Sequence, residues 1–114
     1  MIKDDLIRRM LEFRRERDWE QFHNLRTLST SIVLEAAELA EVTQWARDDD
    51  LPAITERKRE RIEQEVADIA ILLSYDIHDL DIDLDRVVAK KLLLNAEKYP
   101  VSQAKGNAKK YDEF

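Results

Sequence analysis

Apolar residues recur at helical spacing along most of the chain. Asp18 follows the first amphipathic helix that this spacing predicts, and Asn24 is a candidate N-cap for a second helix over about 25–47. The acidic run 48–50, followed by Leu51 and Pro52, closes the second helix. The apolar positions that define the first helix are Leu6, Ile7, Met10, Leu11 and Phe13.

The second half of the chain predicts two more helices. The third should begin near Pro52 or Thr55 and becomes apolar almost all round at 69–73, so this stretch should be buried. Asp83 is the candidate N-cap of a fourth helix, which stops before Pro100.

These four helices, joined by short loops, predict an all-α fold: an antiparallel four-helix bundle in a single domain, 1–114, with 101–114 as an irregular tail. The chain has one Gly and two Pro, which leaves few turn signals for a many-stranded fold. A helix that is apolar all round needs more cover than so small a chain supplies. We therefore expect a homo-oligomer, either a dimer or a tetramer.

Composition narrows the class of protein further. The chain has no cysteine, and none of its apolar runs approaches the ~18 residues of a spanning helix. Its charged N-terminal residues do not resemble a signal peptide, so a cytoplasmic location is expected. The net charge of -6 argues against binding to nucleic acid polymers or membrane surfaces. A free nucleotide remains compatible, because a metal ion can carry it.

Two carboxylate pairs lie among the apolar positions. Glu35 and Glu38 belong to the second predicted helix, and Glu65 and Asp68 to the third. Residues three apart share a helix face, so each pair projects together. If the two helices pack side by side the four acids converge, and two full charges about 5 Å apart repel by ~3 kcal/mol at an effective dielectric of roughly 20. A positive charge is expected between them.

No Lys or Arg occurs in 28–45 or 62–77 to supply that charge, so a cation from solution is the simpler source. Neither pair contains His, and an all-oxygen ligand set favours Mg²⁺, with Mn²⁺ as a substitute. Because Mg²⁺ commonly shares its coordination with substrate phosphates, the site suggests phosphate-ester or phosphoanhydride chemistry.

The same spacing is common on solvated helices, and 39% of this chain is charged. Glu12 with Glu16, and Glu56 with Glu60, are interleaved with Arg and Lys and are interpreted as such surface pairs. Apolar flanks distinguish the two pairs described above from these.

Three segments form a longer ordered pattern. The first, 17–23, reads Arg-Asp-Trp-Glu-Gln-Phe-His; the second joins 35–45 to the acids of 65–68; the third covers 91–100, with Gly, Lys and Tyr following within 106–111. Together they span nearly the whole chain and resemble the all-α nucleoside triphosphate pyrophosphohydrolases, or MazG-like proteins, in particular the dCTP pyrophosphatase branch. The carboxylate pairs are weak motifs singly, but the ordered combination is specific.

The resemblance implies a Mg²⁺-dependent hydrolase that splits a nucleoside triphosphate into the monophosphate and pyrophosphate, removing unwanted or excess nucleotides from the precursor pool. It implies Glu35, Glu38, Glu65 and Asp68 as metal ligands. One acid, Glu38 or Glu41, would orient the attacking water.

The resemblance also implies two sets of substrate-binding residues. The alternative for the lysines of the fourth helix is a favourable interaction with the helix C-terminus, and the alternative for the two tryptophans is a place in the core. The residues expected to hold phosphates are Lys91, Asn95, Lys98 and Tyr99, with Lys109, Lys110 and Tyr111 as weaker candidates; those expected around the base are Trp19, Phe22, His23 and Trp45.

Four departures from the branch affect substrate choice. Met10 stands where the animal enzymes have His, and Leu72 stands where they have Tyr. Thr27 replaces a usual Asn, and Leu93 replaces a polar residue. None is an expected ligand, so the reaction class is unaffected, whereas a changed pocket alters discrimination between bases. dCTP is the first expectation, followed by dATP or a modified pyrimidine deoxynucleotide.

Two other interpretations stay open. One is a non-catalytic helical interaction module, in which the acids form a solvated face or a structural salt-bridge network. The other is a carboxylate-bridged di-iron or di-manganese bundle, which the absence of Glu-x-x-His disfavours.

Overall fold

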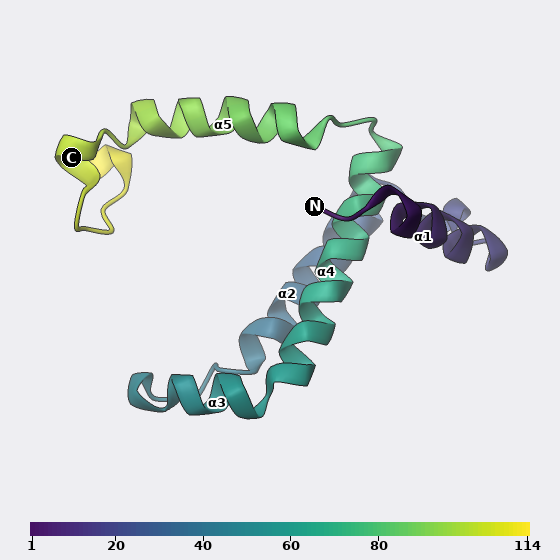
Figure 1. Ribbon diagram of the computed structural model, residues 1–114, viewed down its shortest axis with the longest axis horizontal. Helices are drawn as coiled ribbons and strands as arrows, with labels where there is room; N and C mark the ends of the chain where they lie inside the picture. The colour runs from purple at the N-terminus through teal and green to yellow at the C-terminus, as the bar shows by residue number, and fades with distance from the viewer. The chain divides into compact units, whose positions relative to one another are not determined.

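The computed structural model describes residues 1–114 and contains helices and no strand, which confirms the all-α prediction (Figure 1). The chain divides into two compact units, Met1–Leu80 and Asp81–Phe114. None of the helices is both long and apolar enough to cross a membrane. The helices are α1 (Asp4–Glu16), α2 (Leu25–Glu41), α3 (Leu51–Arg57), α4 (Arg59–Asp79), α5 (Leu84–Lys98) and α6 (Val101–Ala104), with 3₁₀ turns at Glu20–Phe22, Asp48–Asp50 and Tyr111–Glu113.

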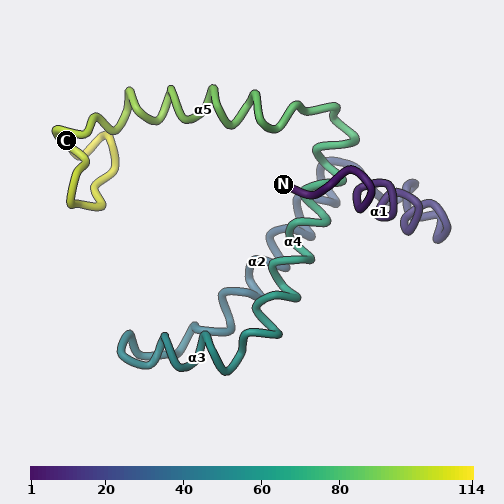
Figure 2. The backbone as a smooth tube through the Cα atoms, viewed as in Figure 1, coloured from purple at the N-terminus to yellow at the C-terminus, as the bar shows by residue number.

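An antiparallel pair of helices, α2 and α4, forms the body of the first unit (Figure 2). The short helix α3 joins them at one end. At the other end α1 packs against α4, so that the first unit is built on three long helices. The fourth long helix that the sequence predicts is present as α5 in the second unit.

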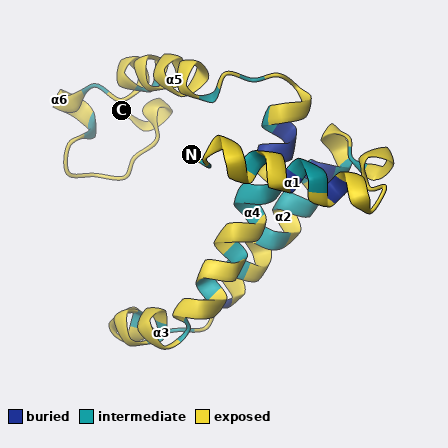
Figure 3. Cartoon of the chain, turned by 45° about the vertical axis from the view of Figure 1, so that its right-hand side comes forward, coloured by how far each residue is buried: buried dark blue, intermediate teal, exposed yellow.

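The buried core of the first unit lies where α1 meets α2 and α4 (Figure 3). Leu28 is only 1% exposed, and Met10 and Tyr75 are buried with it. The partly buried side chains packed against these three are Ile2, Ile7, Leu11, Ile71 and Leu72.

The expectation that 69–73 is fully buried is wrong for the single chain. Residues 69–72 are half-buried, and Leu73 is 38% exposed. Packing against α2 covers one side of α4, which leaves part of this apolar stretch uncovered.

Three other details of the predicted elements are wrong, although the third helix begins at Leu51, next to the predicted Pro52. The second helix was expected to reach about residue 47, but α2 ends at Glu41 in turns closed by short-range bonds such as Thr43 N to Ala40 O. The third is two helices, because the backbone leaves helical geometry at Lys58. Since Lys58 still accepts a hydrogen bond from Ile62 N, the interruption is brief and the apolar pattern continues across it. The tail 101–114 is not wholly irregular, because it contains α6 and a 3₁₀ turn.

Both predicted N-caps are confirmed. Asn24 forms a reciprocal capping box with Thr27: the Thr27 backbone N donates to Asn24 Oδ1 at 3.0 Å, and the Asn24 backbone N donates to Thr27 Oγ1 at 3.0 Å. Asp83 caps α5 by accepting a bond from Arg86 N at 3.2 Å.

Replacing the first of these caps should weaken the fold. Asn24→Ala leaves the Thr27 backbone N–H without its side-chain acceptor and should lower the free energy of unfolding by about 1 kcal/mol, measured by urea titration. Asn24→Ser retains an acceptor and serves as the control with a smaller loss. Equal stability of the wild type and the Ala variant would show that the box contributes nothing.

Candidate active site

Carboxylates from α2 and α4 converge in the first unit. Glu35 and Glu38 of α2 and Glu65 of α4 each offer an oxygen within 4.8 Å of the others. The three-residue spacing puts the two α2 acids on one face, and the packing of α4 against that face brings the third acid to them. Asp68 follows Glu65 by one turn on α4 and lines a cavity that Glu35 also lines. We refer to these four residues as the carboxylate cluster.

The cluster contains buried oxygens without partners. Oε2 of Glu35 and Oε2 of Glu65 are both buried and make no hydrogen bond. No ion pair joins any member to Lys or Arg; the nearest along α2 is the contact of Glu41 Oε2 with Arg61 Nη2 at 3.9 Å. Buried charge of one sign is costly without compensation.

The pKa of Glu35 shows the same repulsion. The neighbouring Glu65 carboxylate, which a protonated Glu35 can hydrogen-bond, raises the pKa of Glu35 to about 7, and burial and the charges of Glu38 and Asp68 add to the effect. The unpartnered oxygens and the all-oxygen donor set suit a hard divalent cation, which would replace that proton.

A cavity of ≈ 670 Å³ opens beside the cluster, between α1, the following loop and α4. This volume lies in the range of small-molecule sites. Phe13 and Trp19 meet edge to face on its rim, with centroids 5.8 Å apart at 73°. Its apolar wall includes Leu6, Met10, Phe13, Trp19, Ile71 and Leu72. The cavity can therefore take a flat, largely apolar group next to the carboxylates.

Only part of the expected base pocket is found at this cavity. Trp19 and His23 line it. Phe22, in the 3₁₀ turn, is 62% exposed and Trp45 is 88% exposed, and neither lines the cavity. Trp45 lies in the turns beyond Glu41, because α2 ends earlier than expected.

The expected phosphate-holding residues belong to the second unit, where the tail folds against the end of α5. Tyr99 meets Tyr111 edge to face at 6.1 Å, and Phe114 at 5.8 Å. Lys98 Nζ lies 4.9 Å from the centroid of the Tyr111 ring. Lys91 and Lys110 are exposed. Asn95 is half-buried, and its backbone carbonyl accepts a hydrogen bond from Tyr99 N.

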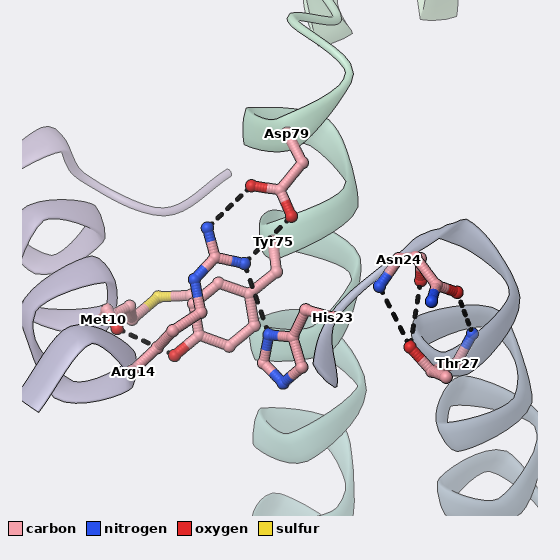
Figure 4. Close-up of polar contacts among 7 residues, drawn as sticks. All are labelled: Met10, Arg14, His23, Asn24, Thr27, Tyr75 and Asp79. Carbon is pink, nitrogen blue, oxygen red and sulfur yellow. Dashed lines mark hydrogen bonds and ion pairs between the residues drawn. The ribbon is translucent and has the colours of Figure 1, made fainter. Parts of the chain in front are cut away.

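A polar network that the sequence pattern did not predict lies beside the cavity. Arg14 donates to both oxygens of Asp79 at 2.9 and 2.7 Å and contacts His23 Nδ1 at 3.3 Å (Figure 4). Tyr75 donates its hydroxyl to the Met10 carbonyl at 2.8 Å. One feature of the sequence could have indicated this network. Arg14 lies four residues after Met10 on α1, so a charged residue occurs on the apolar face of that helix.

Contacts within this network shift the pKa values of its members. The hydrogen bonds of Arg14 lower the pKa of Asp79 and raise that of Arg14. Burial, and then the positive charge of Arg14, lowers the pKa of His23.

Comparison with known proteins assigns the family. A model of the MazG-like family matches residues 30–114, which include the whole carboxylate cluster. This chain belongs to the MazG-like family. The resemblance inferred from the sequence is thereby confirmed.

Relatives and a solved structure agree with this assignment. The MazG-like chain is 38% identical to dCTP pyrophosphatase 1 of Rattus norvegicus and 36% identical to that of Homo sapiens, over 97% of its own length. It spans 66% of the length of each of these relatives. A crystal structure of a pyrophosphatase from Archaeoglobus fulgidus matches with a TM-score of 0.81 and 35% identity, over 85% of this chain and 91% of that one.

The raised pKa of Glu35 predicts how stability depends on pH without metal. Between the ordinary value of 4.5 and about 7, the folded chain holds a proton that the unfolded chain releases, so stability falls as pH rises through this window. Glu35→Gln should therefore raise the melting temperature of the metal-free chain at about pH 8 and do so less at about pH 5.

Divalent cation should reverse that ranking, because the wild type loses its repulsion on binding metal while the variant loses a ligand. Glu56→Gln, on exposed α3, is the control. Destabilisation by Glu35→Gln at the higher pH in the presence of chelator would contradict the description of the cluster.

Proposed function

We propose that this chain is a Mg²⁺-dependent pyrophosphohydrolase that splits deoxynucleoside triphosphates into the monophosphate and pyrophosphate. The observation that carries the proposal is the pair of buried, unpartnered carboxylate oxygens of Glu35 and Glu65 beside a cavity of nucleoside size. The pyrophosphatase names of the relatives and of the matched structure support the same reaction.

Glu35, Glu38, Glu65 and Asp68 would hold the metal. A bound Mg²⁺ would neutralise phosphate charge and lower the pKa of a coordinated water. Glu38 is the better candidate to orient that water, because it is exposed within the cluster. Glu41 is the weaker candidate, since its carboxylate contacts Arg61 instead.

The cavity would take the base, with Trp19 supplying an aromatic face and His23 a polar group. Phe22 and Trp45 do not line the cavity, so they would contact the base only after a rearrangement on substrate binding. The residues proposed to hold phosphate oxygens are Lys91, Asn95, Lys98, Tyr99, Lys110 and Tyr111; within the second unit, Lys98 Nζ lies 4.9 Å from the centroid of the Tyr111 ring.

We propose dCTP as the preferred substrate, then dATP or a modified pyrimidine deoxynucleotide. The relatives named for dCTP support the first choice. The cavity wall carries the apolar side chains of Met10 and Leu72, and these are the reason that we also propose dATP and modified pyrimidine deoxynucleotides. The role would be house-cleaning of the cytoplasmic nucleotide pool, with residues 1–114 acting as one catalytic domain.

Product analysis tests the reaction. Incubation with each common deoxynucleoside triphosphate should give monophosphate and pyrophosphate only when Mg²⁺ is present. Glu38→Ala and Asp68→Ala should each reduce turnover by at least about 100-fold with the helical circular dichroism retained, because each removes a proposed metal ligand. Glu56→Ala is the matched control with unchanged turnover. Diphosphate and phosphate as products, or full turnover in either variant, would refute the proposal.

We also propose that the chain works as a homo-oligomer, a dimer or tetramer. Val33 and Leu34 of α2 are 65 and 60% exposed, and Val66 and Leu73 of α4 are 49 and 38% exposed. Apolar side chains gathered on one helix pair suit burial against a second copy of the same chain.

Light scattering tests the assembly. The wild type should have at least twice the mass of the 13.5 kDa chain. Leu34→Asp should lower the mass toward that of a monomer, since burying an unpaired charge opposes association. Thr55→Asp, on the exposed surface of α3, is the control for added charge. A monomeric wild type would contradict the assembly while leaving the reaction to be judged by its products.

A further inference from the structure

Arg14 is bound on two sides within the first unit. It is 5% exposed, although it is charged, and its guanidinium grips both oxygens of Asp79 at 2.9 and 2.7 Å. The same Nη1 that reaches Asp79 also lies 3.3 Å from Nδ1 of His23. The bidentate contact fixes the plane and direction of the guanidinium, and therefore the direction from which it approaches the imidazole.

This approach fixes the position of the proton on His23. An arginine side chain only donates hydrogen bonds, so Nδ1 of His23 must accept and carries no proton. A neutral ring bonded in this way holds its proton on Nε2. The lowered pKa of His23, caused by burial and by Arg14, agrees with a neutral ring.

The orientation of the ring is fixed as well. Its centroid lies 5.2 Å from that of Tyr75, at 45°, and Arg14 Cζ lies 4.6 Å from the centroid of the same Tyr75 ring. Tyr75 is itself tied to α1 through its bond to the Met10 carbonyl. The imidazole cannot flip without giving up the contact between Arg14 and Nδ1.

Nε2 is the nitrogen left for a ligand. It has no hydrogen-bond partner in the chain, and it lies on the side of the ring away from Arg14 (Figure 4). His23 lines the same cavity as Trp19, Glu35 and Asp68. His23 thus brings one oriented imidazole ring to the lining of this cavity, beside an aromatic side chain.

We propose that Arg14 and Asp79 are positioning residues that hold His23 as an Nε2–H donor to an acceptor atom on the edge of the bound nucleobase. This inference rests on the proposed function for the identity of the ligand, whereas the state of His23 belongs to the free chain. Ring nitrogens and carbonyl oxygens of bases are acceptors of this kind. The donor makes recognition sensitive to the position of an acceptor, which the apolar side chains of the cavity wall do not sense.

Nitrogen NMR of the full chain tests the tautomer directly. Long-range ¹H–¹⁵N correlation should show His23 protonated at Nε2 and bare at Nδ1, with its signals assigned by their loss in His23→Gln. His78, the other histidine, is exposed and serves as the internal reference. In Arg14→Met the His23 signals should shift toward a mixture of tautomers. A wild-type His23 protonated at Nδ1, or already mixed, would overturn the inference whatever the activity of the chain.

Steady-state kinetics with dCTP and Mg²⁺ test the donor. His23→Met should raise KM about 3- to 10-fold with kcat nearly unchanged, and His23→Gln, whose amide N–H replaces Nε2–H, should recover most of the loss. Arg14→Met should raise KM similarly and add little to His23→Met in the double variant, because both act through one contact. His78→Gln should leave both constants unchanged.

Each remaining outcome decides between the two proposals. An unchanged KM in His23→Met, or losses that follow melting temperature without rescue by Gln, would overturn the donor role while the hydrolase stands. A wild type inactive on every nucleotide would overturn the proposed function and the nucleobase as ligand, and the NMR result would still decide the tautomer.

Discussion

The repulsion between Glu35 and Glu65 is the constraint on which the site depends. Packing α2 against α4 is needed to bury apolar surface, yet the same packing brings two carboxylates together with buried oxygens that no side chain satisfies. The folded chain therefore holds a proton at Glu35 up to a pH of about 7 or exchanges it for a cation. Affinity for a hard divalent ion is thus a consequence of how the helices pack, because the ion removes a cost that folding creates.

The placement of α1 depends on a different kind of contact. Arg14 and Asp79 are 65 residues apart and form a bidentate pair at the end of α4. A partly buried ion pair adds little net stability over apolar packing, but its bidentate geometry tolerates few alternative arrangements. It fixes which turn of α1 meets which turn of α4, and so where Met10 and Tyr75 meet in the core. The cavity is bounded by α1, so its shape depends on this pair.

Local patterns predicted what local interactions determine. The capping residues Asn24 and Asp83 were predictable because each cap bonds within three residues of itself, and the carboxylate faces because i, i+3 spacing fixes them. The interruption at Lys58 was not predictable from the sequence, because a break of one residue hardly changes the spacing of the apolar positions. The end of α2 at Glu41 was missed for a similar reason, and with it the position of Trp45. Contacts between distant residues, such as Arg14 with Asp79, depend on how the helices pack, and the spacing of residues along the sequence does not predict them.

The proposed site has two parts: the carboxylate cluster supplies the charge, and the cavity wall supplies the shape. The carboxylate cluster has no means of distinguishing one base from another, because a cation held there would meet phosphates that every nucleotide shares. In the proposed base site, the apolar part of the cavity wall, as at Met10 and Leu72, would distinguish bases weakly, since contacts of that kind discriminate by size and flatness. Sharp discrimination requires polar groups that are left unpaired by the wrong ligand. His23 is such a group on this wall, and the long-range pair between Arg14 and Asp79 is what keeps it oriented. In this proposal, base preference therefore depends in part on Arg14 and Asp79, which would touch neither metal nor base.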